Sequence, residues 1–256
     1  MSDQRPPFDP DPQLVELMRR LLAAGPDGQS PQEMLRRMRQ ELNMFLLHYE
    51  FGLKEIETKV EILNEEHAAL AAHNPIEHVK TRVKSLESLL QKMQRIQCPP
   101  ELDAIRASIR DIAGVRITCR YVSDCYRVAD MLSAQQDITM LELKDYIRTP
   151  KPNGYRSLHL IVQVPVFLAS GAVQVPVEIQ IRTIAMDFWA SAEHELIYKF
   201  RGDLPEHLAS TLREIALTAA DLDAQMTQIR TDAGADPDPT VSQRPAQNSS
   251  VATSPT

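Results

Sequence analysis

Two segments that lie far apart in the chain combine acidic and basic side chains in a pattern suited to phosphate chemistry. One contains Asp111, and the other is the alternating run of residues 177–182, which predicts a β-strand. Successive side chains of a strand point to opposite faces, so Glu178, Gln180 and Arg182 share one face. If the two segments form neighbouring strands, the two carboxylates meet beside arginines. Such a pair suits Mg²⁺ and phosphoryl transfer, although a solvated strand face explains the same polar set.

Residues 145–159 have the composition of a nucleotide-binding loop between two apolar runs. Pro150 and Pro152 favour an extended backbone, and Asn153-Gly154 permits a positive φ and a sharp turn. The loop is predicted to present five basic or aromatic side chains outward, namely Arg148, Lys151, Tyr155, Arg156 and His159. Cations suit phosphates, and an aromatic ring suits a purine. A surface hairpin with scattered charges is the alternative explanation.

A group of cations precedes Asp111. Residues 76–96 are predicted to form a helix, on which Lys80, Lys84, Ser88 and Lys92 are spaced four apart and line one face. On a lone helix, such a row of basic residues would be explained as a solvent-exposed face. Next to a site with two carboxylates, a clamp for a nucleotide triphosphate is the favoured interpretation. The chain has only 8 glycines and no Gly-x-x-x-x-Gly-Lys, so the phosphates are not expected to lie in a glycine-rich loop.

Several other features are given no functional role. The aromatic pair Phe188 and Trp189 is predicted to lie in the core. His194 follows an acidic residue but lacks the second histidine of a zinc-binding helix. The three cysteines match no Cys-x-x-Cys pattern and fit a reducing compartment.

The composition limits the class of protein. The net charge of −7 argues against a chain that binds nucleic acid by bulk electrostatics, so an anion site must be a local basic cluster. No apolar run approaches the ~18 residues that span a bilayer. The N-terminus lacks the apolar segment of a signal peptide. A cytoplasmic protein is predicted.

The order of expected elements predicts an α/β (α+β) fold with a mixed sheet of about five strands flanked by helices. Helices are expected at 13–24, 31–49, 53–72, 76–96, 123–134, 186–200 and 206–230, and strands at 115–119, 138–147, 158–164 and 173–182. The predicted divisions are a disordered N-terminus (1–12), a helical region (13–75), a core (76–200), a C-terminal helix (201–230) and a disordered tail (231–256).

Together these segments resemble the synthetase domain of the RelA/SpoT family, and especially its single-domain members, the small alarmone synthetases. Four blocks carry the resemblance in the family's order: residues 78–92, 109–117, 146–159 and 177–194. The resemblance implies a nucleotidyltransferase-like fold. It also implies a GTP diphosphokinase that transfers pyrophosphate from ATP to the 3′-hydroxyl of GTP or GDP, giving pppGpp or ppGpp and releasing AMP.

The resemblance also implies roles for particular residues. Asp111 and Glu178 would be the catalytic residues and the ligands of Mg²⁺. The ATP-binding residues would be Arg82, Lys84, Lys92 and Arg116. The guanine nucleotide would be held by Lys151, Asn153, Tyr155, His159 and Gln180, with Tyr155 stacked on the base.

The resemblance further implies partners and limits. The chain contains no His-Asp pair, so the family's hydrolase motif is absent and a synthesis-only enzyme is expected. Small members commonly form homotetramers, and some bind an allosteric alarmone or single-stranded RNA. Two alternatives stay open: a nucleotidyltransferase on the same scaffold that releases pyrophosphate, and a catalytically weak regulator that binds nucleotide or RNA.

Overall fold

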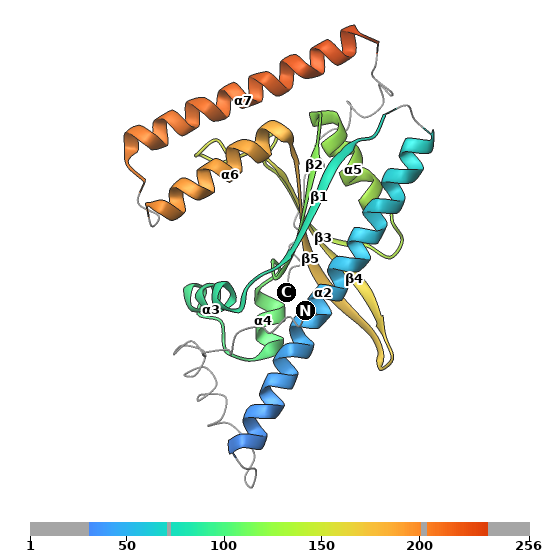
Figure 1. Cartoon of the computed structure of the whole chain (residues 1–256), viewed down its shortest axis with the longest axis vertical. Coiled ribbons are helices and arrows are strands. Elements are labelled where there is room, and N and C mark those ends of the chain that lie inside the picture. Colours follow the sequence, from blue (N-terminus) through green and yellow to red (C-terminus); the bar gives the residue numbers. More distant parts are fainter. Residues whose placement is uncertain (1–30, 71–72, 201–203, 235–256) are drawn as a thin grey trace, which may run out of the picture.

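The computed structural model describes residues 31–70, 73–200 and 204–234. Within them lies a five-stranded mixed sheet with the strand order β1-β2-β5-β4-β3 (Figure 1). The strands are β1 (Ile76–Val83), β2 (Ala113–Cys119), β3 (Thr139–Asp145), β4 (Leu158–Leu168) and β5 (Gly171–Thr183). The predicted fold class is confirmed. The predicted helix at 13–24, the N-terminal residues and the tail beyond 234 lie outside the described residues.

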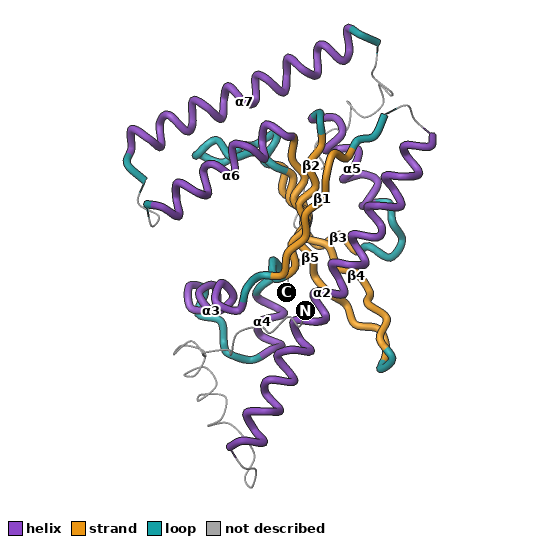
Figure 2. Tube along the Cα trace, viewed as in Figure 1, coloured by secondary structure: helices purple, strands orange, loops and turns teal. Residues whose placement is uncertain are grey.

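Helices cover both sides of this sheet (Figure 2). They are α2 (Pro31–Leu70), α3 (Leu86–Arg95), α4 (Leu102–Ser108), α5 (Val122–Ser133), α6 (Ile184–Lys199) and α7 (Glu206–Asp232). The long helix α2 and helix α5 pack on one face, while α3 and α6 lie on the other side of the sheet (Figure 1). In the described part of the chain, no helix is both long and apolar enough to cross a membrane.

The pairing of β2 with β5 is parallel, and the other three pairings are antiparallel. Strands β4 and β5 form a hairpin whose register runs from Leu158↔Ile181 to Leu168↔Gly171. A parallel pair requires a long crossover, and here α5, β3 and β4 lie between its two strands in the sequence. The crossover places β2 and β5 at the centre of the sheet.

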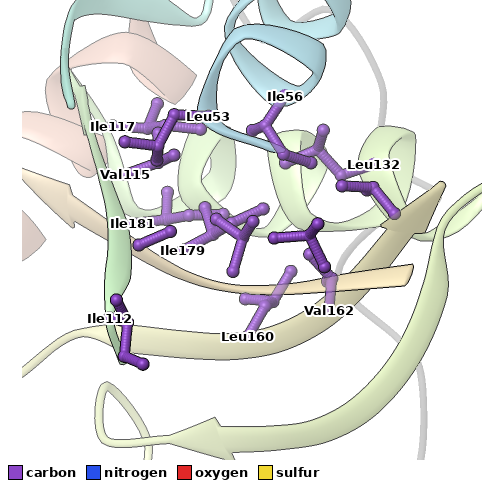
Figure 3. Packing of buried hydrophobic residues seen from close by; sticks show 14 of the residues in the cluster. Leu53, Ile56, Ile112, Val115, Ile117, Leu132, Leu160, Val162, Ile179 and Ile181 are labelled. Carbon is purple, nitrogen blue, oxygen red and sulfur yellow. The ribbon is translucent and has the colours of Figure 1, made fainter. Parts of the chain in front are cut away.

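The hydrophobic core fills the space between the sheet and helices α2 and α5. Leu53 and Ile56 of α2 and Leu132 of α5 face the apolar side of the central strands (Figure 3). The strand residues labelled there are Val115, Ile117, Leu160, Val162, Ile179 and Ile181. All of them are buried, and burial of one such side chain contributes about 1.5–3 kcal/mol. The predicted core face of residues 177–182 is therefore confirmed.

One continuous helix replaces two of the predicted helices. We expected a break between Tyr49 and Leu53, but α2 runs through Gly52 without interruption. A Cβ atom at position 52 would lie 2.7 Å from Cγ1 of Val175. The glycine therefore serves close packing of α2 on strand β5, where the tertiary contact outweighs the low helix propensity of glycine.

The helix predicted at 76–96 is wrong. The segment forms strand β1 and then helix α3, with Ser85 as the N-cap that accepts a hydrogen bond from the backbone N–H of Ser88. Residues four apart share a face in a strand as well as in a helix, so the spacing of Lys80 and Lys84 did not separate the two possibilities. The β-branched Val79, Thr81 and Val83 that alternate with the cations were the missed signal.

The aromatic pair on α6 divides between the core and the surface. Trp189 is 3% exposed, as predicted, and its indole N–H donates to the carbonyl oxygen of Leu212 on α7 at 2.8 Å. The prediction was wrong for Phe188, which is 70% exposed. Adjacent residues of a helix point about 100° apart, so a surface helix buries only one of such a pair.

We predict that Gly52→Leu destabilises the fold by about 1–3 kcal/mol, because the added side chain overpacks the contact with Val175. Urea unfolding followed by circular dichroism measures this free energy. The matched control is Ala69→Leu on the exposed side of the same helix, with an expected change within about 0.5 kcal/mol. Equal stability of the two variants would contradict the packing role of Gly52.

Candidate active site

Side chains from three strands form a row on the face of the sheet opposite the core. Arg82 of β1 pairs with Gly114 of β2, and Gly114 pairs with Glu178 of β5. The adjacent row runs from Lys80 through Arg116 to Gln180, and Gln180 pairs in turn with His159 of β4. Paired residues of neighbouring strands point to the same side, so this face is polar and charged.

A cavity of about 260 Å³ opens above these rows. Its lining consists of Lys80, Thr81, Arg82, Asp111, Gly114, Val115, Arg116, Glu178 and Gln180. Gly114 has no side chain between Arg82 and Glu178, which leaves room for a ligand at the middle of the row. Asp111 and Glu178, the two carboxylates that the sequence indicated, therefore line one cavity with both predicted ATP-binding arginines, Arg82 and Arg116.

Two lysines neutralise Asp111. The Nζ atom of Lys92 on α3 lies 2.5 Å from Oδ1, and that of Lys84 lies 3.1 Å from Oδ2. Burial by itself raises the pKa of Asp111, but the hydrogen bonds and charges of Lys92 and Lys84 outweigh burial and hold the pKa below its usual range. The carboxylate is therefore ionised at neutral pH, with two cations directed at the cavity wall.

Glu178 is held by two neighbours, His159 of β4 and Gln180 of its own strand. Its Oε1 lies 3.2 Å from Nδ1 of His159, and its Oε2 accepts a hydrogen bond of 3.0 Å from the amide of Gln180. Burial raises the pKa of Glu178, but the hydrogen bond and charge of His159 and the hydrogen bond of Gln180 outweigh burial and hold the pKa below its usual range. The nearby charge of Asp111 opposes this lowering, which indicates that the two carboxylates interact.

The predicted purine-binding residue Tyr155 connects the loop to the strands. Its hydroxyl lies 2.7 Å from Nε2 of His159 and accepts a hydrogen bond of 2.5 Å from Arg182. The ammonium group of Lys151 lies 4.9 Å from the centre of its ring and 4.7 Å from that of Tyr146. Tyr155, His159 and Glu178 thus form a continuous hydrogen-bonded chain from the loop to the cavity.

Not every loop residue points outward as predicted. The guanidinium of Arg156 turns inward and donates to the carbonyl oxygen of Ile147 at 2.7 Å. Arg148, by contrast, is exposed as predicted, and its guanidinium lies over the ring of Tyr126, 5.0 Å from its centre. Asn153 is exposed, and its amide donates to Glu193 of α6 at 3.0 Å. Arg156 therefore differs from the prediction, because composition does not specify which side chain of a turn bonds back to the backbone.

Our sequence reasoning gave no role to Asp187, which links the two halves of the site. Its Oδ1 lies 3.3 Å from Nη1 of Arg116 in an ion pair and accepts a hydrogen bond of 3.2 Å from Arg182. Burial lowers the pKa of Arg116, and the positive charge of Arg182 lowers it further. One carboxylate therefore keeps two neighbouring guanidinium groups together. The only signal in the sequence was an acidic residue in the first turn of a predicted helix. Acidic residues are common at this position because they interact favourably with the helix dipole, so the signal did not indicate a site.

The cavity offers Mg²⁺ two carboxylates, those of Asp111 and Glu178. In the described part of the chain, no cluster of three or more His, Cys, Asp and Glu side chains could hold a metal ion. Mg²⁺ in kinase-type sites needs only one or two carboxylates, because waters and substrate phosphates supply its other ligands. Asp111 and Glu178 meet that requirement on one cavity wall.

Comparison with known proteins places this geometry in a family. The model of a region found in RelA / SpoT proteins matches residues 81–203. GTP pyrophosphokinase YwaC of Bacillus subtilis is 49% identical over 185 residues, which cover 72% of this chain and 88% of that protein. The chain therefore belongs to the RelA/SpoT family.

Solved structures agree with this assignment. The small alarmone synthetase 2 from Bacillus subtilis superposes with a TM-score of 0.69 at 47% identity and covers 75% of this chain and 99% of its own. The small alarmone synthetase 1 from the same organism, bound to its product pppGpp, superposes with a TM-score of 0.71 at 39% identity, over 76% of this chain and 99% of its own.

We predict that Lys92→Met raises the pKa of Asp111, because it removes a hydrogen bond and a positive charge that lower it. The depressed pKa means that ionised Asp111 stabilises the fold above its ordinary pKa, and that this contribution is lost as the pH falls through the folded-state value. The variant therefore loses this stability at a higher pH than the wild type. A carbon-13 NMR titration of the carboxyl group measures the shift.

The matched control is Lys59→Met. It removes a second lysine that contacts an aspartate, Asp137, at 2.5 Å. The control leaves the titration of Asp111 unchanged. An unchanged titration of Asp111 in Lys92→Met as well would contradict the role given to Lys92.

Proposed function

We propose that this chain is a GTP pyrophosphokinase that transfers pyrophosphate from ATP to the 3′-hydroxyl of GTP or GDP and so makes pppGpp or ppGpp. One observation carries the proposal: Asp111 and Glu178 line a single cavity. Basic side chains line the same cavity, and the hydrogen bonds that link Tyr155 to His159 end at Glu178. The relative that binds pppGpp and the 49% identity to a GTP pyrophosphokinase support it.

The donor nucleotide occupies the side of the cavity formed by β1, β2 and α3. Arg82 and Arg116 hold the adenine, and the ammonium groups of Lys84 and Lys92 bind the phosphates. Both lysines already contact Asp111 in the protein without nucleotide. The triphosphate then adds further negative charge to this cluster of cations, which favours its binding in the partly buried site.

The acceptor nucleotide occupies the side formed by β4 and the loop at 150–156. Its guanine stacks on Tyr155, with Lys151, Asn153, His159 and Gln180 around the nucleoside. Lys151 is exposed and lies over two aromatic rings, so its side chain is free to move from the ring to a phosphate. The buried Arg182 keeps the phenol in place during this movement.

The reaction joins the two nucleotides. Glu178 takes the proton of the 3′-hydroxyl, and the resulting oxygen attacks the β-phosphorus of ATP in line. The bond between that phosphorus and the oxygen that bridges it to the α-phosphorus breaks, and AMP leaves with the electron pair. Mg²⁺, held by Asp111 and Glu178, would neutralise the charge that develops on the phosphates. His159, whose Nδ1 lies 3.2 Å from Oε1 of Glu178, orients this carboxylate.

We further propose that the protein acts in the cytoplasm as a homo-oligomer, with residues 76–200 as the catalytic core. An apolar groove of about 690 Å³ between α6 and α7 supports assembly, because exposed apolar patches of this kind mark interaction surfaces. Its large apolar members are Ile184, Phe188, Ile215, Leu222 and Met226. A tetramer, an allosteric alarmone and single-stranded RNA are candidates for this chain from the family resemblance.

Incubation of the purified protein with Mg²⁺, ATP and GTP, followed by anion-exchange separation, tests the activity. We predict AMP and pppGpp in equal amounts, and loss of both products when EDTA removes the metal ion. Free pyrophosphate with a nucleotidylated product would indicate a nucleotidyltransferase instead. Nucleotide binding without turnover would indicate a regulator.

We predict that Asp111→Ala and Glu178→Ala each lower turnover by at least about a hundredfold in a protein that still folds, because both line the cavity at the sheet surface rather than the core. The control is Glu195→Ala, an exposed carboxylate on α6 outside the cavity, with unchanged turnover. Activity retained in both carboxylate variants would reject the assignment of the site.

A further inference from the structure

Helix α7 lies beyond the region that the family model matches, which ends at residue 203, yet it contacts the acceptor loop. The second hydrophobic cluster of the protein joins α6 and α7 through Trp189, Ala190, Leu212 and Ala216. Tyr155 packs against this cluster. The ring assigned to the guanine base therefore rests on the C-terminal helix as well as on the sheet.

The loop lies close to α7 at Gly154. This residue has φ of +92°, and a Cβ atom at its position would lie 2.6 Å from the Cβ of Ala216. The same Cβ atom would lie 3.8 Å from the Cα of Arg213, its next neighbour. Ala216 is buried and small, so the backbone of the loop lies close to the helix at this position. A larger side chain at position 216 meets Gly154 first, at the edge of a cavity of about 240 Å³ that both residues line.

Helix α7 is fixed to the rest of the protein on both sides of this contact. The indole of Trp189 donates to the carbonyl oxygen of Leu212, and the hydroxyl of Thr183 at the end of β5 donates to Asp223 at 2.7 Å. Near the end of the helix, the guanidinium of Arg230 lies 3.1 Å from the buried carboxylate of Asp124 on α5. Because these three anchors hold α7 in place, it can act as a rigid support for the loop.

We propose that α7 positions the acceptor loop and that Ala216 is a positioning residue that sets the affinity for the guanine nucleotide. The inference rests on the proposed function, because it assumes that Tyr155 receives the base. A bulkier residue at position 216 pushes Gly154 outward and moves Tyr155 away from His159 and Arg182. The donor side, built from β1, β2 and α3, has no contact with Ala216 and is unaffected.

Isothermal titration of GTP, in the absence of ATP, into the wild type and into Ala216→Ser and Ala216→Leu tests the inference. We expect the Kd for GTP to rise with side-chain size and to be about tenfold to a hundredfold weaker for the leucine variant. The Kd for a non-hydrolysable ATP analogue stays within about twofold in all three proteins, because the donor side is unaffected. The matched control is Ala224→Leu, which places the same side chain at an exposed position two turns further along α7.

Steady-state kinetics separate positioning from a general structural effect. A positioning role raises the KM for GTP and leaves kcat at saturating GTP within about twofold of the wild type. Fluorescence of Trp189, the single tryptophan of the chain, reports whether α7 stays docked. If the leucine variant does not fold, the Kd and KM for GTP of the serine variant test the positioning role.

The outcomes distinguish this inference from the proposed function. Wild-type GTP affinity in both Ala216 variants, or an equal loss of affinity for GTP and for the ATP analogue, overturns the positioning role and leaves the proposed function intact. A wild-type protein that binds no guanine nucleotide overturns the proposed function and the inference with it.

Discussion

The parallel pairing of β2 with β5 is the constraint on which the rest of the site depends. Its register places Gly114 opposite Glu178 and Arg116 opposite Gln180, so residues more than sixty positions apart share one polar face. The same pairing turns Val115, Ile117, Ile179 and Ile181 toward α2 and α5. A shift by one residue would exchange the two faces. The buried core therefore fixes the register, and the register fixes the site.

Charge neutralisation is the second organising feature. Each acidic group at the cavity is held by two polar or charged partners: Asp111 by Lys84 and Lys92, Glu178 by His159 of β4 and Gln180 of its own strand. Asp187 holds Arg116 and Arg182 together in turn. Partly buried charges are costly without such partners. The site is thus organised before substrate binds, and the cations available to the phosphates are already in position.

Much of this arrangement could be predicted where a local pattern had one physical explanation. The alternation in 177–182 specified a strand with Glu178, Gln180 and Arg182 on one face, and the prolines with Asn153-Gly154 specified a turn. The prediction failed at 76–96, where a four-residue spacing fits both a helix and a strand. It also failed at Phe188, because two adjacent aromatic residues do not show which of them faces the core.

The sequence by itself determined the types of residue available for the chemistry, the alternation of the central strands and the family to which the chain is similar, because each depends on order along the chain. Only the tertiary structure decided which residues meet. The role of Asp187 between two arginines, the room left by Gly114 and the contact of Ala216 with Gly154 all arise between elements distant in sequence. Such contacts are set by the register of the sheet and the docking of helices, and no local pattern records them.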